Sequence, residues 1–197
     1  AIMIAMAVGV DDGDDAAARG EAGRGRWHGV VPYDGGMPIR PAVPADLDTI
    51  IELIHGLAEY EREPDAVRLD RDSMREHLFG PRPYAEVLMA ETAGGESAGF
   101  ALFFHNYSTW EGKPGIYLED LFVRPEFRGQ GLGKALLAGI AALAVERKCG
   151  RFEWAVLDWN QPSIDFYVAL GAVPMDEWTT YRVAGEALTA LAAMRAG

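Results

Sequence analysis

Cysteine is nearly absent from this sequence, since Cys149 is the only one among 197 residues. No disulfide can form within the chain, so we expect a reducing, cytoplasmic compartment. Histidine is scarce too, and the four residues, His28, His55, His77 and His105, lie far apart in the sequence. Because they show no paired ligand spacing, we expect no metal site.

Basic residues are also few. The chain has 18 Lys and Arg against 30 Asp and Glu, for a net charge of −12. A nucleic-acid surface needs clustered cations, so we expect no nucleic-acid partner, whereas a small cationic ligand suits the charge. The apolar run Ala1–Val10 is too short to cross a bilayer and lacks the basic flank of a secretory signal. We therefore expect no membrane partner.

The amino end differs in composition from the rest of the chain. Residues 1–36 contain eight glycines and little that could form a core, which predicts a disordered extension. Met37 is a candidate translation start, and residues 37–197 are long enough for one domain with a sizeable core. An extension that binds a partner is the alternative for residues 1–36.

Hydrophobic spacing predicts interleaved helices and strands. The expected helices cover residues 46–60, 70–79, 135–145 and 161–170. The expected strands begin with a short one from Ile39 and continue over residues 85–91, 98–105, 116–123, 152–157 and 178–183. Antiparallel hairpins come first and a βαβ unit later, so the predicted class is α/β (α+β), with a mixed, mostly antiparallel central sheet flanked by helices.

A glycine-rich segment joins the strand at 116–123 to the helix at 135–145. Its residues are Arg128-Gly129-Gln130-Gly131-Leu132-Gly133-Lys134. Glycines let the backbone approach a ligand closely, and the first N–H groups of a helix have no helical partner, so the pattern predicts an anion site. A Walker loop is excluded because Arg128 stands where it needs glycine, and Ala135 offers no hydroxyl. The dinucleotide glycine spacing fails as well, and an ordinary strand-to-helix turn is the alternative.

The pattern Arg-x-x-Gly-x-Gly, formed by Arg128, Gly131 and Gly133, resembles the acetyl-CoA pyrophosphate loop of the Gcn5-related N-acetyltransferase (GNAT) superfamily. The resemblance runs from about Ile39 to Val183 and includes the later segments 158–167 and 170–172. Residues 117–123 and 107–110 are most similar to the spermidine/spermine (diamine) and thialysine acetyltransferases. The resemblance implies an acyltransferase that uses acetyl-CoA, and a homodimer.

The same resemblance implies the residues that bind acetyl-CoA. They are Leu121, Phe122, Val123, Arg128, Gly129, Gln130, Gly131, Leu132, Gly133, Lys134, Asn160, Ser163 and Tyr167. Asn160 also precedes Pro162 at a helix start, where it is a good N-cap, and the two roles are compatible. Tyr167 is the expected general acid for the CoA thiolate, with packing in the core as the alternative.

Acetyl transfer also requires that the acceptor amine lose its proton, and Glu119 is the expected base. The expected substrate-binding residues are Glu61, Trp110, Glu119 and Asp120. Strand alternation turns Asp120 to the face opposite Glu119 unless a bulge intervenes. A solvated acidic face is the alternative for Glu61. Polyamine enzymes carry Asp-Pro-Trp where this chain has Ser-Thr-Trp at residues 108–110, which favours a shorter acceptor.

Three functions remain open at this stage. The first is N-acetylation of a small cationic acceptor, namely a thialysine- or lysine-like compound, a diamine or a polyamine. The second is acetylation of a protein or peptide amine. The third is a non-catalytic CoA-binding regulatory domain, which would require degraded motifs, whereas these motifs are intact.

Overall fold

The structure is a computed structural model that describes residues 31–32 and 38–196. The chain divides into two compact units, one ending at Phe166 and the other beginning at Tyr167. The predicted extension 1–36 lies outside the described residues except for Val31–Pro32, and so does Met37. The strands are β1 Val31–Pro32, β2 Pro38–Pro41, β3 Glu86–Glu91, β4 Ser97–Ser108, β5 Lys113–Val123 and β6 Arg151–Glu153. The α-helices are α1 Leu47–Tyr60, α2 Arg71–Phe79, α3 Leu132–Glu146, α4 Gln161–Ala169 and α5 Gly185–Ala193.

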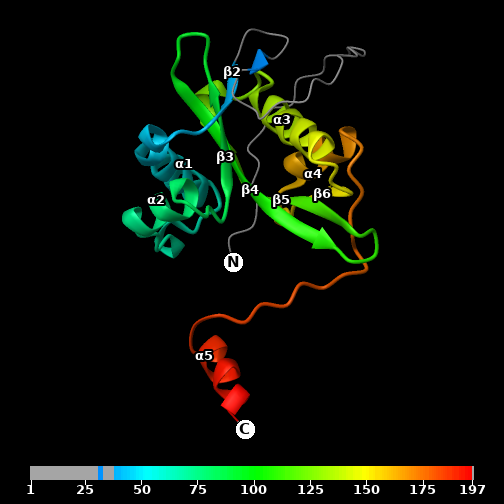
Figure 1. The fold of residues 1–197 in the computed structure, drawn as a ribbon. Coiled ribbons are helices and arrows are strands. Elements are labelled where there is room, and N and C mark those ends of the chain that lie inside the picture. Colours follow the sequence, from blue (N-terminus) through cyan, green and yellow to red (C-terminus); the bar gives the residue numbers. More distant parts are fainter. Residues whose placement is uncertain (1–30, 33–37, 197) are drawn as a thin grey trace. The chain divides into compact units, whose positions relative to one another are not determined.

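The described strands form one sheet in the order β1-β2-β3-β4-β5-β6 (Figure 1). Neighbours from β1 to β5 run antiparallel, whereas β5 and β6 are parallel and are joined through α3. The predicted fold class, a mixed and mostly antiparallel sheet flanked by helices, is confirmed. The short helices η1 Pro44–Asp46, η2 Pro64–Ala66, η3 Pro125–Phe127 and η4 Met194–Ala196 complete the secondary structure.

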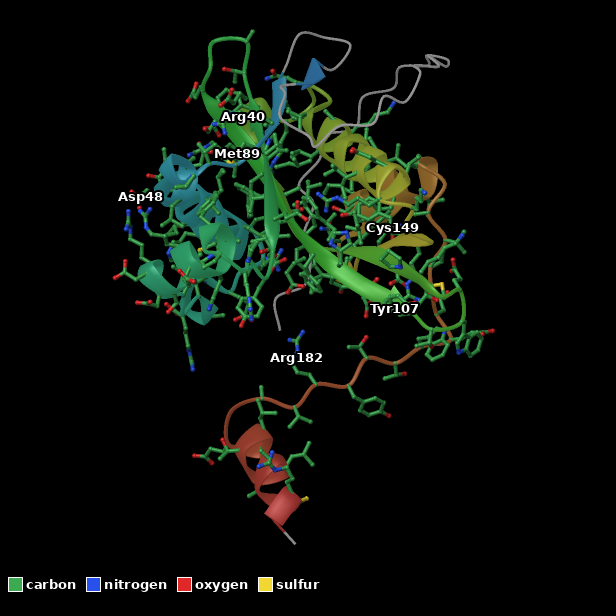
Figure 2. The ribbon with its side chains drawn as sticks, viewed as in Figure 1. Arg40, Asp48, Met89, Tyr107, Cys149 and Arg182 are labelled. Carbon is green, nitrogen blue, oxygen red and sulfur yellow. The ribbon has the colours of Figure 1, made fainter. Side chains whose placement is uncertain are left out.

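Helices α1 and α3 cover opposite faces of the sheet. Val87 and Met89 of β3 pack in one core cluster with Leu53 and other apolar residues of α1. Figure 2 labels Met89. Leu88, which lies between them on the strand, faces α3, because a Cβ placed on Gly139 would lie 3.1 Å from its Cδ1 atom. Alternate residues of a strand point to opposite faces, so both faces of β3 are buried.

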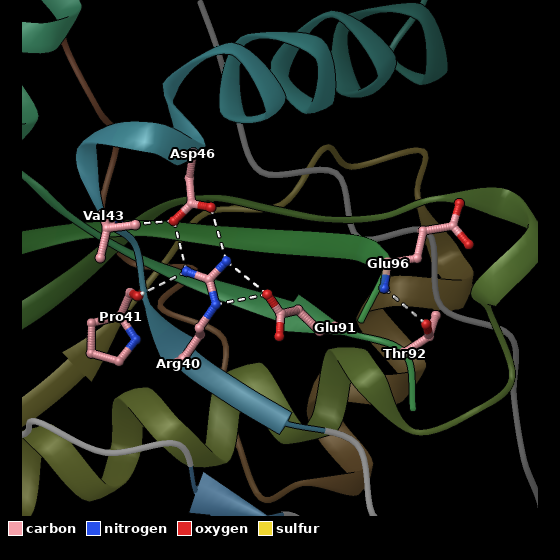
Figure 3. Close-up of polar contacts among 7 residues, drawn as sticks. All are labelled: Arg40, Pro41, Val43, Asp46, Glu91, Thr92 and Glu96. Atoms are coloured by element: carbon pink, nitrogen blue, oxygen red, sulfur yellow. Dashed lines mark hydrogen bonds and ion pairs between the residues drawn. The ribbon is translucent and has the colours of Figure 1, made fainter. Parts of the chain in front are cut away.

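Arg40 fixes the entry to α1. Its guanidinium donates two hydrogen bonds to Asp46, of 2.7 and 2.8 Å, and one of 2.7 Å to Glu91 (Figure 3). Asp46 also accepts a 2.7 Å bond from the backbone N–H of Val43. These contacts join β2, the turn before α1 and the end of β3, and the half-buried guanidinium holds the pKa of Asp46 below its ordinary value.

Two irregularities in β5 determine where the site lies. Leu118 is opposite Phe103 and Asp120 is opposite Leu102, so Glu119 is the extra residue of a β-bulge. On its other side β5 pairs with β6 only as far as Tyr117, opposite Glu153. The predicted strand 152–157 is thus shorter than expected. Beyond Tyr117, β5 remains paired with β4 but has no strand partner on the β6 side among the described residues.

The predicted strand near Trp178–Val183 is wrong. In the second unit this segment has no regular secondary structure, and α5 follows it. Trp178 is 70% exposed and Tyr181 is 91% exposed. Apolar and β-branched residues form a strand only where a neighbouring strand takes up the backbone hydrogen bonds, and sequence pattern does not supply that neighbour.

Candidate active site

The glycine-rich segment has the geometry of an anion-binding loop. Gly129 and Gly131 have φ angles of 73° and 78°, in the left-handed region that other residues avoid. Gly131 caps α3, and its carbonyl accepts the bond from the N–H of Ala135, at 2.9 Å. The backbone N–H groups of residues 132–134 precede this bond, so they are the first-turn donors of the helix. The loop fits a phosphate group of a ligand.

Arg128 turns inward from this loop. Its Nε donates a 3.1 Å hydrogen bond to the carbonyl of Val123, and its guanidinium carbon lies 5.1 Å from the ring centre of Tyr60 and 5.8 Å from that of Phe122. Burial lowers the pKa of Arg128. The side chain of Arg128 therefore links the end of β5 to the end of α1 and holds the start of the loop against them.

Asn160 and Ser163 are both fully buried at the start of α4. The Asn160 carbonyl accepts bonds from the N–H groups of Ser163 and Ile164, both 3.1 Å, so Asn160 occupies the N-cap position as predicted. Its Oδ1 accepts a 3.5 Å bond from the hydroxyl of Tyr60. Its Nδ2 is buried without a hydrogen-bond partner among the described residues. A buried donor left unsatisfied costs about 1–3 kcal/mol, so this amide suits a ligand carbonyl.

Tyr167 lies on α4 one helical turn beyond Ser163. Residues four apart share one face of a helix, and both side chains are buried, with Tyr167 only 4% exposed. The second compact unit begins at this residue. Tyr167 is thus a buried tyrosine whose phenol can carry a proton.

The three predicted strand residues Leu121, Phe122 and Val123 are buried. Phe122 packs in the core cluster on the α1 side, where a Cβ on Gly56 would lie 3.0 Å from its ring. The side chain of Phe122 therefore belongs to the hydrophobic core. A ligand would meet this part of β5 through the backbone, along the edge that extends beyond β6.

Glu61 and Asp120 line one small pocket between the end of α1 and β5. The pocket has a volume of about 20 Å³ and is also lined by Glu63. Asp120 is 6% exposed, and its Oδ1 has no hydrogen-bond partner among the described residues. Burial, followed by repulsion from Glu119 and Glu61, raises the pKa of Asp120 from 3.8 to about 7. Asp120, which follows the bulge, lines the pocket together with Glu61. Glu119, the extra residue of the bulge, is half-buried and does not line the pocket.

Trp110 is not brought to this pocket. It is 93% exposed in the turn between β4 and β5, close to Tyr107, which Figure 2 labels near the end of that hairpin. Seven residue steps along β5 separate Lys113 from Asp120, a distance of roughly 23 Å for an extended strand.

Three residues near the site were missed by sequence reasoning. The ring centres of Tyr60 and Trp159 are 6.2 Å apart, and the guanidinium of Arg62 lies 5.4 Å from the Trp159 ring centre. Arg62 has a φ angle of 65°, which is unusual for a residue other than glycine. Their position in the sequence could have indicated them, since they are direct neighbours of Glu61 and Asn160.

A larger cavity, of about 360 Å³, lies elsewhere and contains none of the predicted site residues. Phe79, Val87 and Leu143 line it, together with the ion-paired Glu86 and Arg147. Within residues 31–32 and 38–196, no group of three or more His, Cys, Asp or Glu side chains is placed to hold a metal ion. None of the helices in this part of the chain has the length and hydropathy that crossing a membrane requires.

The raised pKa of Asp120 predicts a pH-dependent effect on stability. The folded protein holds this proton up to about pH 7, whereas an unfolded Asp releases it near 3.8, so its stabilising contribution is complete below 3.8 and lost as pH rises through 7. Asp120→Asn removes that loss and should raise the free energy of unfolding by about 1–4 kcal/mol above pH 7. Urea unfolding at pH 5 and pH 8 tests this. An equal difference from wild type at both pH values would contradict it.

The sheet that opens beyond β6, the loop before α3 and the buried amide of Asn160 just before α4 make up the candidate site. Residues 48–172 match the model of the Acetyltransferase (GNAT) family, and the chain belongs to that family. It is therefore an acyltransferase, as predicted.

Curated relatives cover most of the chain. It is 41% identical to the thialysine N-epsilon-acetyltransferase of Bos taurus over 78% of this chain and 96% of that protein. It is 32% identical to the L-ornithine N5-acetyltransferase NATA1 of Arabidopsis thaliana, over 78% of this chain and 86% of that protein. Among solved structures, an integron cassette protein of V. cholerae has a TM-score of 0.66 at 25% identity, with 79% of this chain and 97% of that chain covered.

Proposed function

We propose that this protein transfers the acetyl group of acetyl-CoA to a primary amine of a small cationic acceptor, in the first place a thialysine- or lysine-like compound. The observation that carries the proposal is the buried pocket lined by Glu61 and Asp120 next to the open edge of β5. Anionic side chains in a small enclosed space favour an ammonium group over a neutral or anionic one. The names of the relatives, thialysine and ornithine acetyltransferases, agree with such an acceptor.

The donor side of the proposal rests on three features of the chain. The loop at residues 128–134 offers first-turn N–H groups to the pyrophosphate, and the backbone of residues 121–123, which lies beyond the pairing with β6, is the contact for the pantetheine. The unsatisfied Nδ2 of Asn160 donates to a pantetheine carbonyl, and Ser163 lies beside it. Acetyl-CoA supplies an acetyl thioester when bound.

Two side chains handle protons in the proposed reaction. An amine with a pKa near 10.4 is almost entirely protonated at pH 7, and removing that proton costs roughly 4.6 kcal/mol. Glu119 is our candidate to accept it, because this carboxylate is half-buried, precedes Asp120 on β5 and raises the pKa of Asp120 by charge repulsion. The neutral nitrogen then forms the bond to the acetyl carbon, and the bond from carbon to sulfur breaks. Tyr167 donates its phenolic proton to the sulfur, the second proton of the nitrogen restores the phenol through solvent, and Glu119 releases its proton to water.

The compartment and the oligomeric state belong to the same proposal. A single cysteine and the resemblance to diamine and thialysine acetyltransferases are the grounds for a cytoplasmic homodimer. Sedimentation of the purified protein measures the oligomeric state directly.

An acceptor panel tests the function. Acetyl-CoA-dependent thiol release is measured with thialysine, lysine, ornithine, cadaverine, spermidine and a lysine-containing peptide. We expect the highest kcat/KM with the amino acids and a lower value with spermidine, because Ser108 and Thr109 stand where polyamine enzymes carry an acid and proline. A higher kcat/KM with the peptide would favour the second candidate, a protein acetyltransferase. No release with any amine would refute the proposal.

A further inference from the structure

The carboxyl group of Asp120 is buried, and the charged side chains that line its pocket are acidic. Glu61 and Glu63 approach it from the end of α1 and the turn that follows, and Glu119 precedes it on β5. The other residues that line the pocket are apolar, and none of them is Lys, Arg or His. The residues that line the pocket therefore include no base that could neutralise a charged Asp120.

Two species can neutralise this carboxylate, a proton or a bound cation. The pocket of about 20 Å³ is large enough for one water-sized group, since a single water requires at least 10–15 Å³. An ammonium head group is of similar size and brings three N–H donors. Oδ1 of Asp120, buried and lacking a hydrogen-bond partner among the described residues, is an acceptor for one of them.

We propose that Asp120 carries a proton in the empty enzyme and releases it to solvent when an ammonium group of the acceptor enters the pocket. The inference rests on the proposed function, because it takes the acceptor to be a cationic amine. One O–H bond of Asp120 breaks, its proton leaves to water, and the carboxylate that remains accepts a hydrogen bond from the ammonium. The net charge of the pocket is therefore the same before and after the ammonium group binds.

This exchange makes acceptor binding depend on pH in a defined range. The pKa of Asp120 in the empty protein is about 7, raised by burial and by Glu119 and Glu61. A lysine-like amine stays protonated far above that pH, so its own titration does not contribute. The KM for the acceptor should therefore rise about tenfold for each pH unit below 7 and become constant above it.

Calorimetry measures the released proton without relying on turnover. The protein is saturated with CoA, which has no acetyl group to donate, and is titrated with thialysine at pH 6 and pH 8.5. Each titration is repeated in two buffers of different ionisation enthalpy, so that the difference in heat counts protons. We expect about one proton released per thialysine at pH 6 and close to none at pH 8.5.

Asp120→Asn is the decisive variant. It should release no proton at pH 6, give a KM that is constant from pH 5.5 to 8 within about twofold, and bind thialysine about 10–100-fold more weakly at pH 8. Its melting temperature shows whether it folds. Should it fail to fold, Glu61→Gln serves instead, since removing one repelling charge moves the KM inflection to lower pH. Glu59→Gln, an exposed acid on α1, is the matched control and should leave the inflection unchanged.

The results separate this inference from the proposed function. If thialysine binds and is acetylated but wild type releases no proton at pH 6, proton exchange is wrong and the function stands. The same holds if Asp120→Asn releases as many protons as wild type. If thialysine neither binds nor supports thiol release, the proposed function fails and the inference fails with it.

Discussion

Replacement of Tyr167 with Phe is expected to lower kcat by about 10²–10⁴-fold, the usual contribution of a general acid. The change keeps the buried ring and its apolar contacts and removes only the hydroxyl. A CoA thiolate has a basicity close to that of a cysteine thiolate, with a pKa near 8.5, so it also leaves unaided to some degree. We therefore expect the smaller end of that range, and a smaller defect above pH 8.5 than at pH 7.

The matched control for this prediction is Tyr84→Phe, which removes a hydroxyl from a tyrosine that is 78% exposed. It should leave kcat unchanged. Steady-state kinetics at saturating acetyl-CoA and acceptor give the comparison, and melting temperatures show that both variants fold. Turnover of Tyr167→Phe within a few-fold of wild type would make Tyr167 a packing residue and water the source of the proton.

Gly131→Val is expected to weaken acetyl-CoA binding by about 100-fold or more, which corresponds to about 3 kcal/mol. Two physical effects contribute. The valine side chain would occupy the space that we propose for the pyrophosphate at the first turn of α3, and a φ angle of 78° is strained for a β-branched residue. Isothermal calorimetry with CoA measures the affinity.

The strain is separated from the steric effect by a second glycine. Gly95, in the turn between β3 and β4, has a φ angle of 81° and open space around its Cβ position. Gly95→Val therefore carries the same backbone penalty away from the loop and should lower the melting temperature without changing CoA affinity. Unchanged affinity in a folded Gly131→Val protein would place the pyrophosphate elsewhere.

The sequence predicted the main helices and the sheet because their signals are local. The apolar spacing of residues 46–60 corresponds to α1, which begins at Leu47, and the predicted second helix begins one residue after Asp70, whose carboxylate caps it with a 2.8 Å bond from the N–H of Ser73. The pattern at residues 178–183 failed for the opposite reason. A strand needs a neighbour, and residues 178–183 remain irregular.

In the candidate site, too, local features were predictable from the sequence and contacts between distant residues were not. The anion loop was predictable, because left-handed glycines and unbonded first-turn N–H groups follow from residues that are adjacent in the chain. Arg128 shows the limit of that reasoning. Its motif predicts contact with acetyl-CoA, which stays a prediction, but the motif does not reveal that the side chain packs against Tyr60, a residue distant in sequence.

The sequence by itself determined the class of protein and the glycine-rich loop before α3, and it supplied the acidic residues that we propose for the acceptor site. Only the tertiary structure decided which acids meet. Residue alternation cannot reveal that Glu119 is the extra residue of a bulge, because a bulge is defined by the register with β4. Nor can it reveal the pKa of Asp120, since burial and the charge of Glu61 act on it only after α1 has packed against the sheet.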